Sequence, residues 1–149
     1  MAGDDFIISD DKTRLDLDVI HGFLHEAYWS AGISRRRVAR AIEHSLCFGV
    51  YEAVSDRQVG FARVITDRTV MAHLLDVFIL EPYRGRGLGR RLVTAVFAHP
   101  ELQNLRRWSL ATDDAHELYR KFGFKPLTPA QVEMTMQKLD PDAYKRPDR

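Results

Sequence analysis

Glycines occupy every second position of Arg84-Gly85-Arg86-Gly87-Leu88-Gly89-Arg90, three of the other four residues are arginines, and these residue types at this spacing could hold an anion. Glycines at every second position let the backbone turn sharply and expose successive N–H groups, because no Cβ atoms obstruct them. At the start of a helix such N–H groups attract negative charge, and arginine side chains match phosphate oxygens in pairs. Apolar residues 77–80 precede the segment, and a helical pattern follows it. The segment therefore predicts a phosphate cradle between a strand and a helix.

Two common phosphate-binding motifs do not fit this segment. A P-loop needs Lys-Ser or Lys-Thr after its last glycine, whereas Gly89 is followed by Arg90-Arg91. The dinucleotide fingerprint needs a third glycine three residues after its second. Counted from Gly85 and Gly87, that place is Arg90. The phosphate-bearing cofactor must therefore be of another kind.

The pattern Arg84-x-x-Gly87-x-Gly89 resembles the loop that holds the coenzyme A pyrophosphate in the GNAT superfamily of acyl-CoA-dependent N-acetyltransferases. A second GNAT signature follows in Ala115-His116-Glu117-Leu118-Tyr119-Arg120-Lys121-Phe122-Gly123-Phe124. There an Ala, then Leu-Tyr, then Gly-Phe close the cofactor site of the family. Two motifs in the family's order are far more specific than either alone. The alternative is a glycine-rich turn followed by an ordinary amphipathic helix.

The resemblance implies acetyl-CoA as cosubstrate and indicates which residues would bind it. The backbone of residues 77–79 would pair with the two amides of the pantetheine arm, as an added strand would. The same residues would also form a buried central strand. Thr112 stands where the family often has Asn, so the side-chain amide that Asn would offer the cofactor is replaced by a hydroxyl. The expected cofactor-binding residues are Val77, Phe78, Ile79, Arg84, Gly85, Arg86, Gly87, Leu88, Gly89, Arg90, Thr112 and Ala115.

Tyr119 is the candidate general acid. Amine attack on a thioester expels a thiolate, and a phenol placed at the sulfur can protonate it. A free thiol titrates near pH ~8.5 and tyrosine near ~10, so the transfer needs no extreme pKa. The resemblance implies this role, because the family commonly has a tyrosine acid at this place. The alternative is a buried helical tyrosine whose hydroxyl is satisfied by a hydrogen bond.

A base must also act, because an aliphatic amine with a pKa of about 10.4 is mostly protonated at neutral pH. Asp76 comes one residue before the cofactor-contacting strand segment, where acidic residues often serve in the family, and its side chain should face opposite Val77. Glu26 and His73 are further candidates. Each of these three could equally be a hydrogen-bonded structural residue.

The acceptor pocket is expected around the first two helices and their connection. Tyr28 and Trp29 stand there, next to Gly32, and aromatic residues in a loop either line a pocket or anchor the loop to the core. Four arginines on the second helix would form a solvated face or bind an acidic partner. They are Arg35, Arg36, Arg37 and Arg40. The residues expected to contact the acceptor are Glu26, Tyr28, Trp29 and His73.

The chain as a whole has the composition of one ordinary globular domain, spanning residues 1–149, with 45% hydrophobic and 29% charged residues. A net charge of +1 gives no pull toward nucleic acid or anionic membranes. Cys47 is the only cysteine, and residues 1–5 lack the features of a signal peptide, so we expect a cytoplasmic protein. No metal is expected. The chain could also form a homodimer.

Hydrophobic periodicity predicts strands at Phe6–Ser9, 46–53, Gln58–Thr66, 70–80, 107–112, 124–127 and 132–136. Helices are expected after Asp16, after Ser34 and after the glycine segment. A fourth, at 115–122, would be capped by Asp113 or Asp114. The fold class is therefore α/β (α+β). A mixed, mostly antiparallel sheet of about six to seven strands is flanked by about four helices, and residues 140–149 form a mobile tail.

These features together predict an N-acetyltransferase that moves the acetyl group of acetyl-CoA to a primary amine by direct attack. Cys47 lies in a predicted strand away from both motifs, which argues against an acyl-cysteine intermediate. The alternative is a non-catalytic acyl-CoA-binding sensor or interaction module. Tyr119 together with Asp76 favours the enzyme, because a protein that only binds needs neither.

Overall fold

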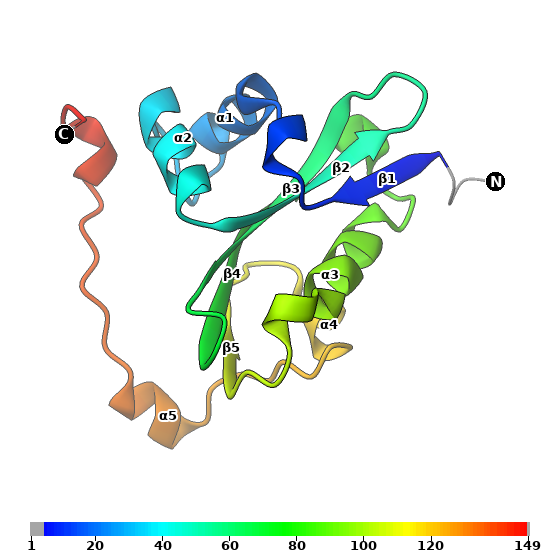
Figure 1. Ribbon diagram of the computed structural model, residues 1–149. Coiled ribbons are helices and arrows are strands. Elements are labelled where there is room, and N and C mark those ends of the chain that lie inside the picture. The colour runs from blue at the N-terminus through cyan, green and yellow to red at the C-terminus, as the bar shows by residue number, and fades with distance from the viewer. Residues whose placement is uncertain (1–4, 149) are drawn as a thin grey trace.

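Three long antiparallel strands form the centre of the sheet, in a computed structural model that describes residues 5–148 (Figure 1). They are β2 (Leu46–Glu52), β3 (Gln58–Thr66) and β4 (Met71–Ile79). β1 (Phe6–Ser9) pairs with β2 in antiparallel orientation, and β5 (Arg107–Ser109) pairs with β4 in parallel. The order is β1-β2-β3-β4-β5. The predicted mixed, mostly antiparallel sheet is confirmed, with five strands within residues 5–148 rather than the predicted six to seven.

Helices cover both faces of this sheet (Figure 1). α1 (Leu17–Glu26) and α2 (Arg35–Glu43) lie on one face, and α3 (Leu88–Ala98) lies on the other with α4 (His116–Arg120). Side chains of neighbouring strand residues point to opposite faces of the sheet and so pack against different helices. Cys47 and Phe61 pack with the α1–α2 side, whereas Phe48 and Ala62 pack with the α3 side. The central strands are therefore buried on both faces, which is why they are nearly continuous apolar runs.

Side-chain caps start the first two helices as expected. Asp16 accepts hydrogen bonds from the backbone N–H groups of Asp18 and Val19, and Ser34 accepts one from Arg37. The predicted cap of α4 is wrong. Neither Asp113 nor Asp114 caps that helix, and the hydroxyl of Thr112 instead accepts a hydrogen bond from the N–H of Ala115 at 3.0 Å.

A β-bulge in β4 separates its second half from β5. Arg63 pairs with Leu75 and Phe61 with Phe78, so one residue of β3 faces both Asp76 and Val77. Asp76 has a φ of 56°, a left-handed conformation that is strained for a non-glycine residue. A bulge bends its strand. β4 and β5 stay paired only from Met71–Arg107 to His73–Ser109 and then diverge.

The C-terminal region differs from the prediction. Residues 124–127 form no strand, and the segment predicted as the last strand begins as helix α5 (Pro129–Met134). Thr128 and Gln131 form a capping box at its start, which overrides the alternating pattern at Val132 and Met134. Short 3-10 turns occur at Lys12–Arg14, Glu81–Tyr83, Pro100–Leu102 and Ala143–Lys145.

The last turn, Ala143–Lys145, lies against α2. The guanidinium of Arg37 lies over the ring of Tyr144, and the Ser34 hydroxyl donates a hydrogen bond to Asp148. The mobility predicted for residues 140–149 stays a prediction, and residue 149, like residues 1–4, lies outside the described part. Within residues 5–148, no helix has the length and apolar character needed to cross a membrane.

Candidate active site

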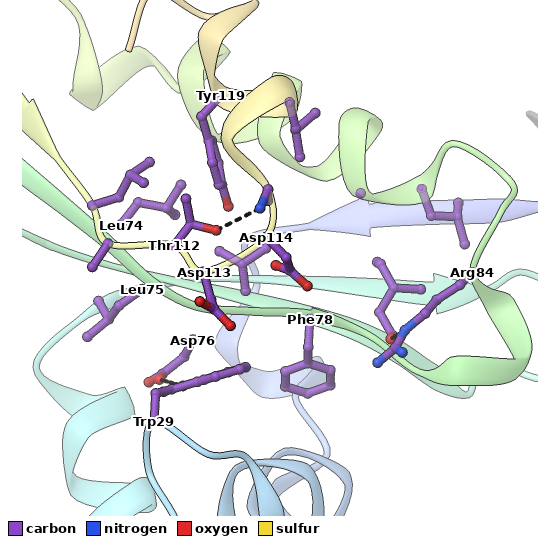
Figure 2. Close-up of a pocket in the computed structure, with 18 of the residues that line it drawn as sticks. Trp29, Leu74, Leu75, Asp76, Phe78, Arg84, Thr112, Asp113, Asp114 and Tyr119 are labelled. Atoms are coloured by element: carbon purple, nitrogen blue, oxygen red, sulfur yellow. Dashed lines mark hydrogen bonds between the residues drawn. The ribbon is translucent and has the colours of Figure 1, made fainter. Parts of the chain in front are cut away.

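A cavity of about 780 Å³ lies where β4 and the chain after β5 diverge (Figure 2). Residues from both faces of the sheet line it. Trp29 lies below β4 in the view, Tyr119 and Thr112 lie above, and Arg84 marks the end next to the glycine segment. The bulge therefore opens a cleft through the sheet, and both sequence motifs border it.

The glycine segment forms one end of this cavity. Gly85 and Gly87 have φ values of 80° and 76°, which L side chains rarely adopt. Gly87 begins α3 without a side-chain cap, and the first N–H of this region to find a backbone acceptor is that of Arg91. The N–H groups of residues 85–90 donate to no described residue. A Cβ atom added at Gly85, Gly87 or Gly89 would meet only open space. These features fit a diphosphate group bound at the start of a helix.

The three arginines of the segment take different positions. Arg84 lines the cavity, and its Nε donates a hydrogen bond to the carbonyl oxygen of Ile79 at 2.9 Å. Arg86 lies over the rings of Phe6 and Tyr83 and does not line the cavity. Arg90 does not line it either. Arg84 is thus the one cation of the segment that the structure brings to the cavity wall.

Tyr119 projects from α4 toward the cavity (Figure 2). Its residue is buried, and its hydroxyl makes no hydrogen bond to any residue among 5–148. Burial raises the pKa of this phenol above its usual value near 10, and the negative charge of Asp114 raises it further. The phenol therefore keeps its proton at neutral pH and can donate it.

Asp76 is held between a strand and the connection of α1 to α2. Its Oδ1 accepts a hydrogen bond from the indole N–H of Trp29 at 2.9 Å, and its Oδ2 pairs with Nε of Arg63 at 2.8 Å. Arg63 also donates to the hydroxyl of Ser45. The Arg63–Asp76 pair is largely shielded from solvent, with side chains 14% and 9% exposed. Asp76 faces the cavity beside Trp29 (Figure 2) and faces opposite Val77, as predicted.

His73 also lines the cavity, three residues before Asp76. Its Nδ1 lies 2.8 Å from the hydroxyl of Ser109 on β5. Burial lowers the pKa of this imidazole, and the charge of Arg63 lowers it further. His73 is therefore uncharged at neutral pH, a state in which an imidazole can accept a proton.

Most of the predicted site residues meet at the cavity. Val77, Phe78, Ile79, Leu88, Gly89, Thr112 and Ala115 line it with the residues described above, and so does Tyr28. Glu26 does not. It is exposed at the end of α1, and its predicted contact with an acceptor stays a prediction.

Sequence reasoning missed three charged residues of this region. Asp113 and Asp114 face the cavity between Thr112 and Phe78, although the pattern suggested them only as helix caps (Figure 2). The sequence pattern did not predict a role for Arg63. An arginine in the middle of the apolar run of β3 was the available signal, because a charge there requires a partner.

Cys47, the only cysteine, is buried in β2 and does not line the cavity, and burial raises its pKa to about 11. Across the described part of the chain, no three His, Cys, Asp or Glu side chains are grouped so that they could hold a metal ion.

The chain is similar to known acetyltransferases in both sequence and structure. Residues 43–126, more than half of the chain, match the family model of the acetyltransferase (GNAT) domain. A Gibberella zeae protein that carries the name "Putative acetyltransferase FG08082" is 30% identical, with 87% of this chain and 89% of that protein covered. A crystal structure of a GNAT-family protein from Xanthomonas campestris has a TM-score of 0.87 at 46% identity, covering 95% of this chain and 97% of that one.

A more distant structure shares the fold alone. Glucosamine-6-phosphate N-acetyltransferase from Arabidopsis thaliana has a TM-score of 0.62 at 18% identity, with 90% of this chain and 97% of that chain covered. The matched family model, the two nearer relatives and the cleft with its glycine cradle agree with one another. The chain belongs to the GNAT family of acetyltransferases, which use acetyl-CoA as cosubstrate.

Proposed function

We propose that the protein transfers the acetyl group of acetyl-CoA to a primary amine by direct attack on the thioester. The observation that carries the proposal is the position of Tyr119. Its hydroxyl has no hydrogen-bond partner within the described residues, and the residue lines the same cavity as the glycine cradle. The burial of Cys47 outside this cavity supports direct attack rather than an acyl-cysteine intermediate.

Acetyl-CoA would lie along the cleft with its diphosphate at the glycine segment. The free N–H groups of residues 85–90 and the guanidinium of Arg84 would hold the diphosphate oxygens. The backbone of residues 77–79 would pair with the amides of the pantetheine arm. Thr112 and Ala115 would border this arm from the other side of the cleft. Arg86 and Arg90 would act at longer range, because neither lines the cavity.

Tyr119 would act as the general acid. When the amine attacks the thioester carbon, the bond from that carbon to sulfur breaks and the sulfur leaves with the electron pair. The phenol of Tyr119 gives its proton to this thiolate, which leaves as the free thiol, and the phenolate regains a proton from water. Burial raises the pKa of Tyr119, so the phenol is in its protonated form before the reaction begins.

Asp76 would receive the proton of the acceptor amine. Each of its carboxylate oxygens accepts one hydrogen bond, so each retains a lone pair for an incoming ammonium group. The fixed contacts to Trp29 and Arg63 would hold the carboxylate in one orientation. Asp113 and Asp114 add negative charge to the same cavity, which favours a cationic acceptor. Tyr28 and Trp29 would contact its apolar part, and His73 is the second candidate base.

The test is release of free coenzyme A thiol with a panel of small amines and N-terminal peptides. Tyr119→Phe keeps the ring and removes only the acidic proton, so we expect turnover to fall by about 10²–10⁴-fold with unchanged acetyl-CoA affinity. Tyr83→Phe is the matched control, because Tyr83 also lines the cavity but has no assigned chemical role. An unaffected Tyr119→Phe variant would remove Tyr119 from the mechanism.

Asp76→Asn and His73→Gln distinguish the two candidate bases. We expect Asp76→Asn to lower turnover and His73→Gln to leave most of it. The reverse result would assign the base to His73. If the protein binds coenzyme A but turns over no amine in the panel, it is a binding module instead.

A further inference from the structure

A second cavity, of about 220 Å³, lies along α2, apart from the cleft, and we call it the α2 pocket. Three arginines and a histidine dominate its wall, and none of its lining residues borders the cleft. The lining residues are Arg36, Arg37, Arg40, Ala41, His44 and Asp148. Pockets for drug-sized molecules usually measure about 300–1,000 Å³, so the α2 pocket has room for a small ligand only. It is a basic site that the proposed acetyl transfer does not use.

The first turn of α2 consists of arginines, which is an unfavourable arrangement for a helix. Arg35, Arg36 and Arg37 follow the N-cap Ser34, and the turn contains no acidic residue. A helix N-terminus carries partial positive charge, so basic side chains there lower the stability of the helix. Arg36 and Arg40 are also four residues apart, a spacing at which like charges repel. The helix keeps these arginines at a cost in stability, as residues of a binding site often do.

The cations of the α2 pocket outnumber the anions within their reach. Arg37 has one carboxylate partner, Asp148, whose Oδ1 lies 3.8 Å from the arginine Nε. Arg36 and Arg40 form an ion pair with no acidic side chain among residues 5–148. Arg35 on the same helix does not line the pocket, and it pairs with Asp18 at 2.9 Å. The excess of positive charge is therefore confined to the pocket.

The carboxylate of Asp148 marks the place where this pocket holds an anion. Its Oδ2 accepts a hydrogen bond from the hydroxyl of Ser34 at 2.6 Å, and the same hydroxyl oxygen accepts the N–H of Arg37 at 3.1 Å. The guanidinium of Arg37 lies 5.2 Å from the ring centroid of Tyr144, and Figure 1 shows the C-terminal turn beside α2. One carboxylate thus occupies the positive end of α2, and the other two arginines of the pocket keep no counter-ion within the described chain.

We propose that the α2 pocket binds a phosphate dianion, free or as a small monoester, which takes the place of the Asp148 carboxylate. Such a group carries about two negative charges and three acceptor oxygens. Guanidinium groups match these oxygens in pairs, so one phosphate would engage all three arginines of the pocket, whereas Asp148 pairs with one. The Ser34 hydroxyl, released by Asp148, would donate to the same phosphate. The chain's own carboxylate therefore competes with the ligand.

The test is calorimetric titration with inorganic phosphate at constant ionic strength, with saturating coenzyme A present to occupy the glycine segment. Arg40→Gln should weaken phosphate binding at least about tenfold, because a hydrogen bond between charged groups is lost. Arg35→Gln is the matched control and should bind phosphate as the wild type does, because Arg35 does not line the pocket. Asp148→Asn should bind phosphate about two- to fivefold more tightly, because the competing charge is removed. Thermal melts establish that all three variants fold.

Methyl phosphate and succinate identify the chemistry of the ligand. Methyl phosphate that binds at least as tightly as inorganic phosphate assigns the pocket to a monoester, and weaker binding assigns it to free phosphate. Succinate, a dicarboxylate, should bind more weakly than either, and equal binding would overturn the choice of phosphate. The proposal also fails if the wild type binds no phosphate at millimolar concentration, if Arg40→Gln binds it like the wild type, or if Asp148→Asn binds it no more tightly. None of these outcomes depends on acetyl transfer, so the proposed activity is tested separately.

Discussion

Asp76 joins three parts of the molecule through one carboxylate. It lies at the bulge of β4, accepts a hydrogen bond from Trp29 in the α1–α2 connection, and pairs with Arg63 on β3. The strained backbone at Asp76 is retained because these contacts hold it in place. A change at Trp29 should therefore be felt at the proposed base.

We expect Trp29→Phe to lower kcat/KM for the acceptor amine, because an aromatic ring remains but the indole N–H donor to Asp76 is lost. Loss of a hydrogen bond to a charged group should also cost about 1.5 kcal/mol of stability, the lower end of the range for such bonds, because Trp29 is partly exposed. Steady-state kinetics and urea unfolding measure the two effects. Tyr28→Phe is the control, because the exposed Tyr28 hydroxyl has no partner among the described residues. Equal effects of both changes would show that the Trp29–Asp76 bond has no special role.

At the scale of elements, the glycine segment and the start of α3 act as one unit. Gly87 and Gly32 both have positive φ, 76° and 83°, and a Cβ added to either meets no atom within 4 Å. Alanine should therefore strain both positions by a similar amount, roughly 1–2 kcal/mol. Only Gly87 lies at the proposed diphosphate site.

We thus expect Gly87→Ala to weaken coenzyme A binding at least about tenfold, while Gly32→Ala binds as the wild type does. The thermal shift caused by millimolar coenzyme A measures this difference. If both variants show the same shift as the wild type, the cradle lies elsewhere.

Local signals explain which elements the sequence could predict. Capping residues such as Asp16 and Ser34, and the glycine pattern itself, act over a few residues and were interpreted correctly. Contacts between distant residues were not accessible, so Arg63 as partner of Asp76 was missed. At residues 132–136 two local signals competed. The capping box Thr128-Pro129-Ala130-Gln131 started a helix where apolar alternation predicted a strand.

At the scale of the whole molecule, a buried thiol and a buried phenol make the folded state less stable at alkaline pH. Burial raises the pKa of Cys47 to about 11 and that of Tyr51 to about 12, above ordinary values of 9.0 and 10.0. The unfolded chain therefore loses these protons first as the pH rises. Stability is fully present below pH 9.0 and declines through the window up to about pH 12.

We expect Tyr51→Phe to flatten this decline. The Tyr51 hydroxyl is buried without a hydrogen-bond partner in residues 5–148, so its removal should cost little at neutral pH. Between pH 10 and 12 the variant should lose about 1.4 kcal/mol less per pH unit than the wild type. Urea unfolding at pH 7.5 and pH 10.5 gives the comparison. Parallel stability curves for the two proteins would assign the alkaline loss to other groups.

The cleft opened by the bulge is bordered from both faces of the sheet, by α4 residues such as Tyr119 on one side and by Trp29 on the other. Acetyl-CoA and the acceptor amine would then enter the cleft from opposite faces of the sheet and meet at its centre. Neither reactant would have to leave before the other enters, and each product would retain its own exit. One extra residue in β4 thus interrupts the pairing of the sheet, and the cleft that results is lined from both of its faces.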